Sequence, residues 1–156
     1  MIMNVKDKVA VCSRSFSKNE VLRKEILSRY KNVKFNDEGL SLVGDKLIEF
    51  LRDQNKVIIG LEKIDDSVLN QITTLKVVSK YGVGIDMIDL QAMKKHKVKL
   101  GWKGGVNKRA VSELVICYAI SVLRHVPVAS SEVSAGIWNQ HKGNLLTNKT
   151  FGIIGF

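Results

Sequence analysis

Several residue types are scarce in this chain of 156 residues, which has two cysteines, one proline and only 6% aromatic residues. Cysteines as far apart in the sequence as Cys12 and Cys117 provide neither a disulfide framework nor a zinc site. No apolar run approaches the roughly 18–20 residues that a membrane span needs. We therefore expect a reduced, cytoplasmic protein without a metal site or a membrane segment.

The charge is strongly positive, with 25 Lys and Arg against 15 Asp and Glu, a formal net charge of +10. Such an excess attracts anions, including nucleic acids and small acidic substrates. The densest basic stretch, 94–109, contains a single aromatic residue, Trp102, whereas nucleic-acid sites often combine aromatic and basic residues. Lys97 and Lys99 alternate with apolar residues, as on the solvent side of an edge strand. We favour a solvated face over a nucleic-acid site.

Strand and helix patterns alternate over the first hundred residues. This alternation predicts a parallel sheet with helices on both faces, in a flavodoxin-like or Rossmann-like domain over residues 1–103. The β-branched and apolar runs predict strands at 8–12, 33–36, 56–61, 75–81 and 98–102. The helical spacings predict helices at 17–30, 42–52 and 65–72, and one more beginning near Asp86.

The pattern changes after a flexible joint at Gly104 and Gly105. A wide apolar stripe predicts a long helix over 107–125, which Asn107 would cap and which Pro127 would follow. A second amphipathic piece covers 130–138, and FGIIGF at 151–156 has the composition of a strand. Because such a strand would lack neighbours in this chain, we expect the sequence to stop at the beginning of a second domain.

The most informative segment is 78–86 (VSKYGVGID), where a predicted strand enters the glycine turn Gly82-Val83-Gly84 and a helix leaves it. Glycines let backbone N–H groups approach a ligand closely, and a following helix would add positive charge for a carboxylate or phosphate. A turn without any ligand is the more frequent use of this pattern. Arg14 and Lys63 also follow predicted strands, on the side of the sheet where α/β proteins bind ligands.

Other possible sites are weaker. Gly155 follows a strand-like run, as does the first glycine of a G-x-G-x-x-G dinucleotide fingerprint, but only one glycine of that pattern is present. His96, His125 and His141 lie near predicted helix or loop ends, where surface or capping roles are the usual ones.

Three segments together resemble the D-isomer-specific 2-hydroxyacid dehydrogenases, and most of all the phosphoglycerate dehydrogenase branch. The segments are LKVVSKYGVGIDMIDLQAM, GVNKRAVSELVICYAISVLRHVP and GIWNQHKGNLLTNKTFGIIGF. The resemblance is clear over 75–156 and looser over 8–74.

The resemblance implies a substrate domain at 1–103 and, at 104–156, the first elements of a nucleotide-binding domain. The family reaction is hydride transfer between a 2-hydroxy or 2-oxo acid and NAD. Its catalytic Arg, Glu and His belong to the later half of the family's sequence, and none is present here. The family also implies a homodimer, with Trp138 in a segment near the dimer contact.

The resemblance assigns roles to a few residues of this chain. Val83 and Gly84 match the turn whose N–H groups hold the substrate carboxylate, and the Val83 side chain would lie near the nicotinamide. Gly155 matches the first fingerprint glycine, and Asn107 and Val111 would lie near the cofactor cleft.

The chain also departs from the family pattern. Met87 replaces a usual Asn, Trp102-Lys103-Gly104 replaces an Asn-Thr/Ala-Pro segment, and Leu61-Glu62-Lys63 stands where bacterial enzymes often carry an Arg. The last change argues against phosphoglycerate as the substrate.

Two hypotheses remain open. The first is the N-terminal part of an NAD-dependent dehydrogenase, inactive by itself. The second is a non-enzymatic, flavodoxin-like module that binds an anion or regulates a full-length relative.

Overall fold

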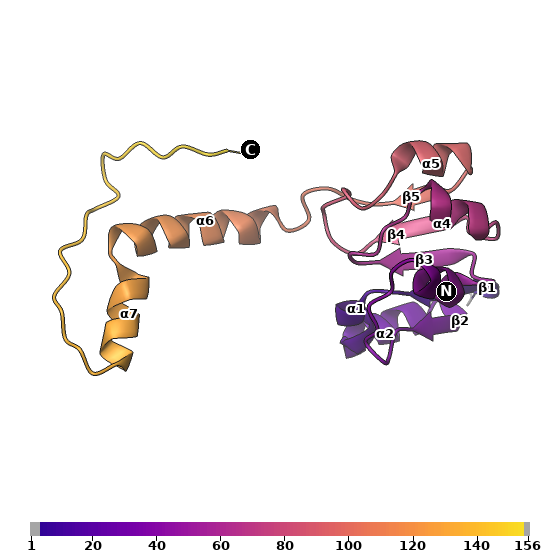
Figure 1. Cartoon of the computed structure of the whole chain (residues 1–156), viewed down its shortest axis with the longest axis horizontal. Helices are drawn as coiled ribbons and strands as arrows, with labels where there is room; N and C mark the ends of the chain where they lie inside the picture. Colours follow the sequence, from indigo (N-terminus) through magenta and orange to yellow (C-terminus); the bar gives the residue numbers. More distant parts are fainter. Residues whose placement is uncertain (1–3, 155–156) are drawn as a thin grey trace. The chain divides into compact units, whose positions relative to one another are not determined.

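A computed structural model of the chain describes residues 4–154 (Figure 1). The chain divides into two compact units, with the division between Val106 and Asn107. We describe each unit by itself.

The first unit is built on a five-stranded, wholly parallel sheet with the strand order β2-β1-β3-β4-β5. This is the order of doubly wound, flavodoxin-like sheets. The predicted α/β class and parallel sheet are therefore confirmed. The strands are β1 (Asn4–Val11), β2 (Tyr30–Phe35), β3 (Lys56–Ile59), β4 (Val77–Lys80) and β5 (Lys99–Gly101).

Helices cover both faces of this sheet. Successive residues of a strand point to opposite faces, so neighbouring residues pack against different helices. On β1, Ala10 packs in a cluster with residues of α3, α4 and α5, whereas Val9 and Val11 pack in a second cluster with Phe16 and Ile26 of α1 and α2. The helices of this unit are α1 (Arg14–Lys18), α2 (Glu20–Leu27), α3 (Asp45–Leu51), α4 (Asp66–Gln71) and α5 (Leu90–Lys95).

The helix predicted over 17–30 is wrong, because Asn19 divides it into two. The Asn19 N–H donates to the carbonyl of Phe16 and ends α1, and its side chain accepts a hydrogen bond from the Leu22 N–H and begins α2. A side-chain cap of this kind competes with helix continuation. Tyr30, the last residue of the predicted helix, begins β2.

The helix expected near Asp86 begins four residues later, at Leu90. The Asp89 carboxylate caps it by accepting the N–H groups of Gln91 and Ala92, each at 2.9 Å. Ile88 is meanwhile held in a parallel bridge with Ile64. This bridge keeps the chain extended before the helix, so residues 81–88 form a long loop at the end of β4. At 42–52 the helix likewise starts late, at Asp45.

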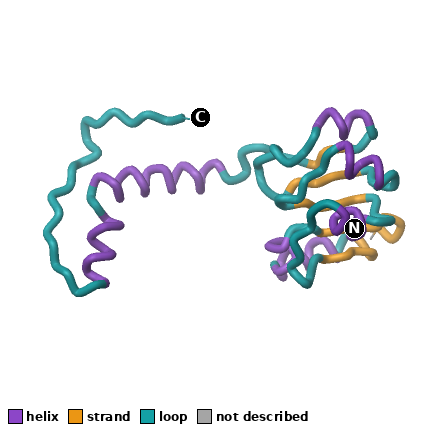
Figure 2. Tube along the Cα trace, viewed as in Figure 1, coloured by secondary structure: helices purple, strands orange, loops and turns teal. Residues whose placement is uncertain are grey.

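The second unit contains α6 (Lys108–Leu123) and α7 (Val126–Ser134), followed by irregular chain up to Ile154 (Figure 2). Pro127 lies in the first turn of α7, where its missing N–H costs nothing, so the prediction of 130–138 for this helix was placed too late. Asn107 occupies the N-cap position of α6 but makes no capping hydrogen bond through its side chain.

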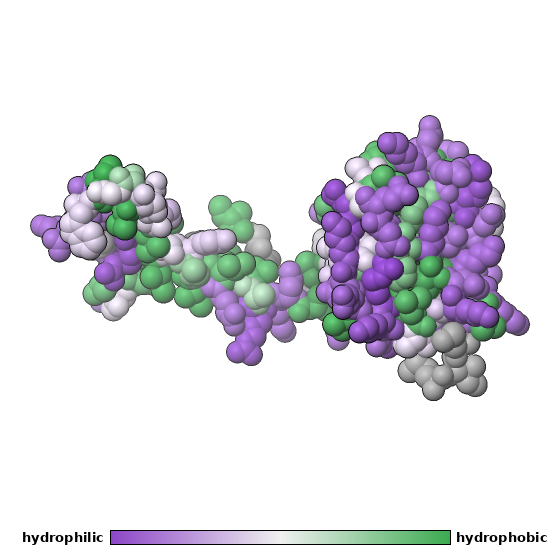
Figure 3. All heavy atoms as spheres, turned by 90° about the horizontal axis from the view of Figure 1, so that it is seen from below, coloured by the Kyte–Doolittle hydropathy of each residue, from purple (hydrophilic) through white to green (hydrophobic). Residues whose placement is uncertain are grey.

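The strand expected at 151–156 is absent from the part that is described, since 151–154 pair with no other strand. Gly155 and Phe156 lie outside the described residues. Neither α6 nor α7 has a buried residue, and apolar side chains reach the surface of this unit (Figure 3). No single helix between residues 4 and 154 is long and apolar enough to span a membrane. The α6–α7 pair, bent by 66°, would satisfy that test by length and composition.

Asp65 generates a prediction about the pH dependence of stability. It caps α4 by accepting the Val68 N–H, and hydrogen bonds from Ser67 and Lys63 lower its pKa from 3.8 to about 2. A lowered pKa in the folded state stabilises the fold above pH 3.8, and this stabilisation is lost as the pH falls through 2. Asp65→Asn keeps the cap but removes the charge.

We expect Asp65→Asn to reduce the free energy of unfolding by about 0.5–1 kcal/mol at pH 7 and by almost nothing at pH 2. Urea unfolding at several pH values measures this difference. Asp45→Asn, a change in the first turn of α3, serves as the matched control. An equal loss at pH 2 and pH 7 would show that the Asp65 charge does not stabilise the fold.

Candidate functional site

A cleft of about 420 Å³ with charged side chains in its lining lies where β1, β3 and β4 end. These strands are adjacent and parallel, so the loops that follow them meet at one edge of the sheet. Ligands of open α/β sheets bind at this edge. The cleft is lined by Ser13, Arg14, Ser15, Gly60, Leu61, Glu62, Lys80, Tyr81 and Gly82.

The loop after β1 is fixed by buried polar groups. The Ser13 hydroxyl caps α1 by accepting the Phe16 N–H at 3.3 Å. The buried Asn36 side chain donates to the carbonyl of Cys12 at 2.9 Å, which holds the end of the strand in place. Arg14 is exposed on this fixed loop, and none of the ion pairs among residues 4–154 involves it. The cleft thus has a guanidinium available for an anion.

Gly60 and Glu62 form the wall after β3. Gly60 packs closely on the first loop, since a Cβ at this position would lie 3.1 Å from the Ser13 hydroxyl oxygen. The Glu62 carboxylate turns back and accepts the Gly60 N–H at 2.6 Å. The cleft therefore contains a half-buried carboxylate beside the end of a central strand.

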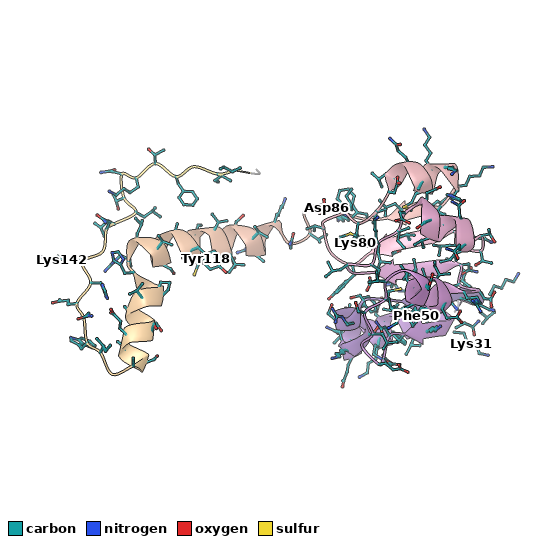
Figure 4. The ribbon with its side chains drawn as sticks, in the orientation of Figure 1. Lys31, Phe50, Lys80, Asp86, Tyr118 and Lys142 are labelled. Carbon is teal, nitrogen blue, oxygen red and sulfur yellow. The ribbon has the colours of Figure 1, made fainter. Side chains whose placement is uncertain are left out.

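The end of β4 supplies the third wall. The Lys80 ammonium donates hydrogen bonds to the carbonyls of Gly60 and Tyr81 and so joins the ends of β3 and β4. The Tyr81 ring meets the Phe16 ring edge to face, with 5.3 Å between the centroids. In Figure 4, Lys80 and Asp86 lie near the same end of the strands. Of the loop that joins them, Tyr81 and Gly82 line the cleft.

This loop presents free backbone donors. Gly82 has φ +121°, a conformation that favours glycine, and the Val83 carbonyl accepts the Trp102 indole N–H at 2.9 Å. The N–H groups of Gly82, Val83 and Gly84 donate to no acceptor among the described residues. In other proteins, successive backbone N–H groups that converge in a turn bind anions.

The residues predicted to bind the substrate do not all line the cleft. Arg14 lines the cleft. Val83 and Gly84 do not line it, although they follow the lining residue Gly82 in the chain. Lys63 does not line it, because its ammonium pairs with Asp65 at 3.0 Å. The assignment of these residues to substrate binding stays a prediction.

The predicted cofactor residues lie elsewhere in the sequence. Asn107 and Val111 belong to the second unit, where both are exposed, and Gly155 lies outside the described residues. Trp138 is also in the second unit, with 86% of its surface exposed. Their cofactor and dimer roles remain untested predictions.

Sequence reasoning gives no binding role to Glu62, Lys80 or Tyr81, although Lys80 and Tyr81 lie within the informative segment 78–86. The loop after the third predicted strand is visible in the sequence, but an anionic ligand favours its lysine, Lys63, over its glutamate, Glu62. Lys80 belongs to a strand, where a lysine usually indicates a solvent face. Only the spatial meeting of two strand ends shows that its ammonium spans them.

The remaining reactive groups stay outside this cleft. Burial raises the pKa of the Cys12 thiol well above its ordinary value, so this thiol stays protonated and unreactive. His96 and His141 bond the carboxylates of Asp66 and Glu132 on the surface. Among the described residues no group of His, Cys, Asp and Glu could hold a metal ion.

A larger hollow of about 520 Å³ lies within the second unit, between α6 and the irregular segment that carries Leu146 and Phe151. Its walls are mostly apolar, with Val115, Val122 and Leu123 supplied by α6. This hollow lacks the several charged side chains of the first cleft. The first cleft is therefore the better candidate for binding an organic acid.

Comparison with known proteins identifies relatives of most of the chain. Residues 9–151 match the family described as D-isomer specific 2-hydroxyacid dehydrogenase, catalytic domain. YoaD of Bacillus subtilis, provisionally named a 2-hydroxyacid dehydrogenase, is 30% identical over 88% of this chain and 44% of its own length. D-3-phosphoglycerate dehydrogenase of Dictyostelium discoideum is 29% identical over 83% of this chain and 33% of its own length.

A solved structure agrees on the fold. The NAD+-bound 3-phosphoglycerate dehydrogenase of Entamoeba histolytica superposes with a TM-score of 0.65 at 23% identity, covering 92% of this chain and 44% of that one. The chain thus spans less than half the length of the relatives that it matches.

The positive φ of Gly82 predicts a specific stability effect. We expect Gly82→Ala to lower the free energy of unfolding by about 1–3 kcal/mol, because a Cβ is strained in this conformation. Gly84→Ala is the matched control, since Gly84 has no positive φ and its Cβ would meet only ordinary contacts. Chemical denaturation measures both variants, and equal stabilities would contradict the loop conformation.

Proposed function

Since this chain belongs to the D-isomer specific 2-hydroxyacid dehydrogenase family, we propose that it supplies the substrate-holding domain of an NAD-dependent dehydrogenase. The reaction would transfer a hydride between a 2-hydroxy or 2-oxo acid and NAD. The chain would correspond to the N-terminal part of such an enzyme, with the substrate domain at 1–103 and the beginning of the nucleotide-binding domain at 104–156. The division between Val106 and Asn107 lies close to this boundary.

One observation carries the proposal. The N–H groups of Gly82, Val83 and Gly84 lack acceptors among the described residues and lie at the ligand-binding edge of the sheet. A carboxylate accepts such donors in charge-assisted hydrogen bonds, which are about twice as strong as neutral ones. Because α5 begins only at Leu90, the donors come from the loop itself and not from a helix end.

NAD is the proposed cofactor because the structure of the related Entamoeba enzyme contains NAD+. The residues described here do not form a dinucleotide site by themselves, since a G-x-G-x-x-G fingerprint would only begin at Gly155. We assign no hydride-transfer step to residues of this chain. The Arg, Glu and His of the family would act from its later half, and a homodimer is the proposed assembly.

The turn generates a binding prediction. We expect D-lactate to shift the backbone amide signals of Val83 and Gly84 in the isotope-labelled chain, with a dissociation constant on the order of 1 mM for so small a ligand. Nuclear magnetic resonance titration measures this. The methyl ester of D-lactate, which has the same skeleton without the charge, is the matched control. Equal shifts with acid and ester would contradict carboxylate binding at the turn.

A second prediction concerns catalysis. The 156-residue chain should not reduce NAD in the presence of D-lactate or D-glycerate, because the family's catalytic Arg, Glu and His are not among its residues. The absorbance of NADH provides the measurement, with a full-length relative as the positive control. Turnover by this chain alone would show that the reaction does not require the family's Arg, Glu and His.

A further inference from the structure

Trp102 links the segment after β5 to the glycine turn after β4. Its indole N–H donates a hydrogen bond to the Val83 carbonyl at 2.9 Å, across 19 positions of the sequence. Because β4 and β5 are adjacent and parallel, the segments that follow them emerge at the same edge of the sheet. Both residues belong to the first unit. A side chain from one strand end thus holds a backbone group at the end of its neighbour.

The ring of Trp102 is in turn packed against the backbone that follows it. A Cβ at Gly104 would lie 3.1 Å from the indole Cη2 atom and 3.2 Å from Cζ2, so the missing side chain lets the backbone approach the ring. A tryptophan side chain has only two rotatable bonds and loses little conformational entropy when it is fixed. The packing of Gly104 therefore helps to set the direction of the indole N–H.

This hydrogen bond acts on the peptide group that carries one of the proposed carboxylate donors. The Val83 carbonyl and the Gly84 N–H belong to the same planar, trans peptide, in which they point in opposite directions. A bond that fixes the carbonyl therefore also fixes the direction of the N–H. Hydrogen bonds in a chain polarise one another, so the bond at the carbonyl also makes the Gly84 N–H a stronger donor.

The peptide between Val83 and Gly84 needs such a restraint. The N–H groups of both residues donate to no acceptor among the described residues, and Gly84 is exposed. Glycine adopts both signs of φ with similar ease, so this peptide can rotate and turn its N–H away from a ligand. An acid would then have to order the turn as it binds, and that cost lowers the affinity.

We propose that Trp102 is a positioning residue for the carboxylate site, directing the Gly84 N–H toward the bound acid through its hydrogen bond to the Val83 carbonyl. This inference rests on the proposed function, because it requires the acid carboxylate to bind at the 82–84 turn. Trp102 acts through the peptide and takes no part in hydride transfer. Coupling between two binding events is reciprocal, so an acid bound to the Gly84 N–H strengthens the indole hydrogen bond.

Trp102→Phe removes the indole N–H and keeps an aromatic ring beside Gly104. We expect the dissociation constant for D-lactate to rise about threefold to tenfold, as the loss of one hydrogen bond implies. Without ligand, the order parameter of the Gly84 N–H should fall from about 0.85 to below about 0.6, and relaxation dispersion detects slower rotation of the peptide. Trp138→Phe, the same change at an exposed residue of the second unit, is the matched control and should alter neither quantity.

The unmodified chain provides a spectroscopic test. It has two tryptophans, and the spectrum of Trp102→Phe assigns their indole N–H signals. We expect D-lactate to move the Trp102 signal downfield, because the polarised Val83 carbonyl becomes a stronger acceptor. The methyl ester of D-lactate should leave this signal in place, and the Trp138 signal should move with neither compound.

The outcomes separate the inference from the proposed function. If D-lactate shifts the turn amides but binds Trp102→Phe as tightly as the unmodified chain, with unchanged Gly84 dynamics, Trp102 does not position the turn and the proposed function stands. If Trp102→Phe and Trp138→Phe weaken binding alike, the effect does not come from the hydrogen bond and the inference is refuted. If D-lactate moves neither the turn amides nor the Trp102 signal, the carboxylate site fails, and the inference fails with it.

Discussion

The parallel alignment of five strands is the constraint from which the candidate site follows. It brings the ends of β1, β3 and β4 together at one edge, although the residues that follow these strands are up to about seventy positions apart in the sequence. Parallel strands also require crossovers, whose helices bury both faces of the sheet. Ala10 and Val11, adjacent residues of β1 that point to opposite faces, are accordingly both completely buried. A rigid central sheet therefore carries polar loops at its edge.

Much of this fold could be predicted from residue patterns. The β-branched runs identified all five strands, and the acidic pair at Asp65 and Asp66 correctly indicated the start of α4. Pattern reasoning failed where one side chain competes for the backbone. The apolar spacing predicts one continuous helix where Asn19 separates α1 from α2. Asp89, and not Asp86, caps α5. Both caps are local hydrogen bonds, but the chain before Asp89 is also held extended by the long-range Ile64–Ile88 bridge, which no local pattern contains.

The candidate site was only partly predictable for a related reason. The glycine turn is visible as a motif, and the rule that ligands bind beyond strand ends points to Arg14. The roles of Glu62 and Lys80 depend on contacts with Gly60, whose N–H and carbonyl they respectively bond. In the sequence, Glu62 and Lys63 are adjacent charged residues, and nothing local indicates which of them faces the cleft. In the structure one turns into the cleft, and the other pairs with Asp65.

The central claim is that the 82–84 turn holds the carboxylate of a 2-hydroxy or 2-oxo acid. A crystal structure of the chain with oxamate, a stable analogue of a 2-oxo acid, tests it most directly. The account predicts that the oxamate carboxylate lies within hydrogen-bonding distance of the Val83 and Gly84 N–H groups, with the rest of the molecule toward the cleft. A carboxylate bound elsewhere, with those N–H groups facing only water, would contradict it.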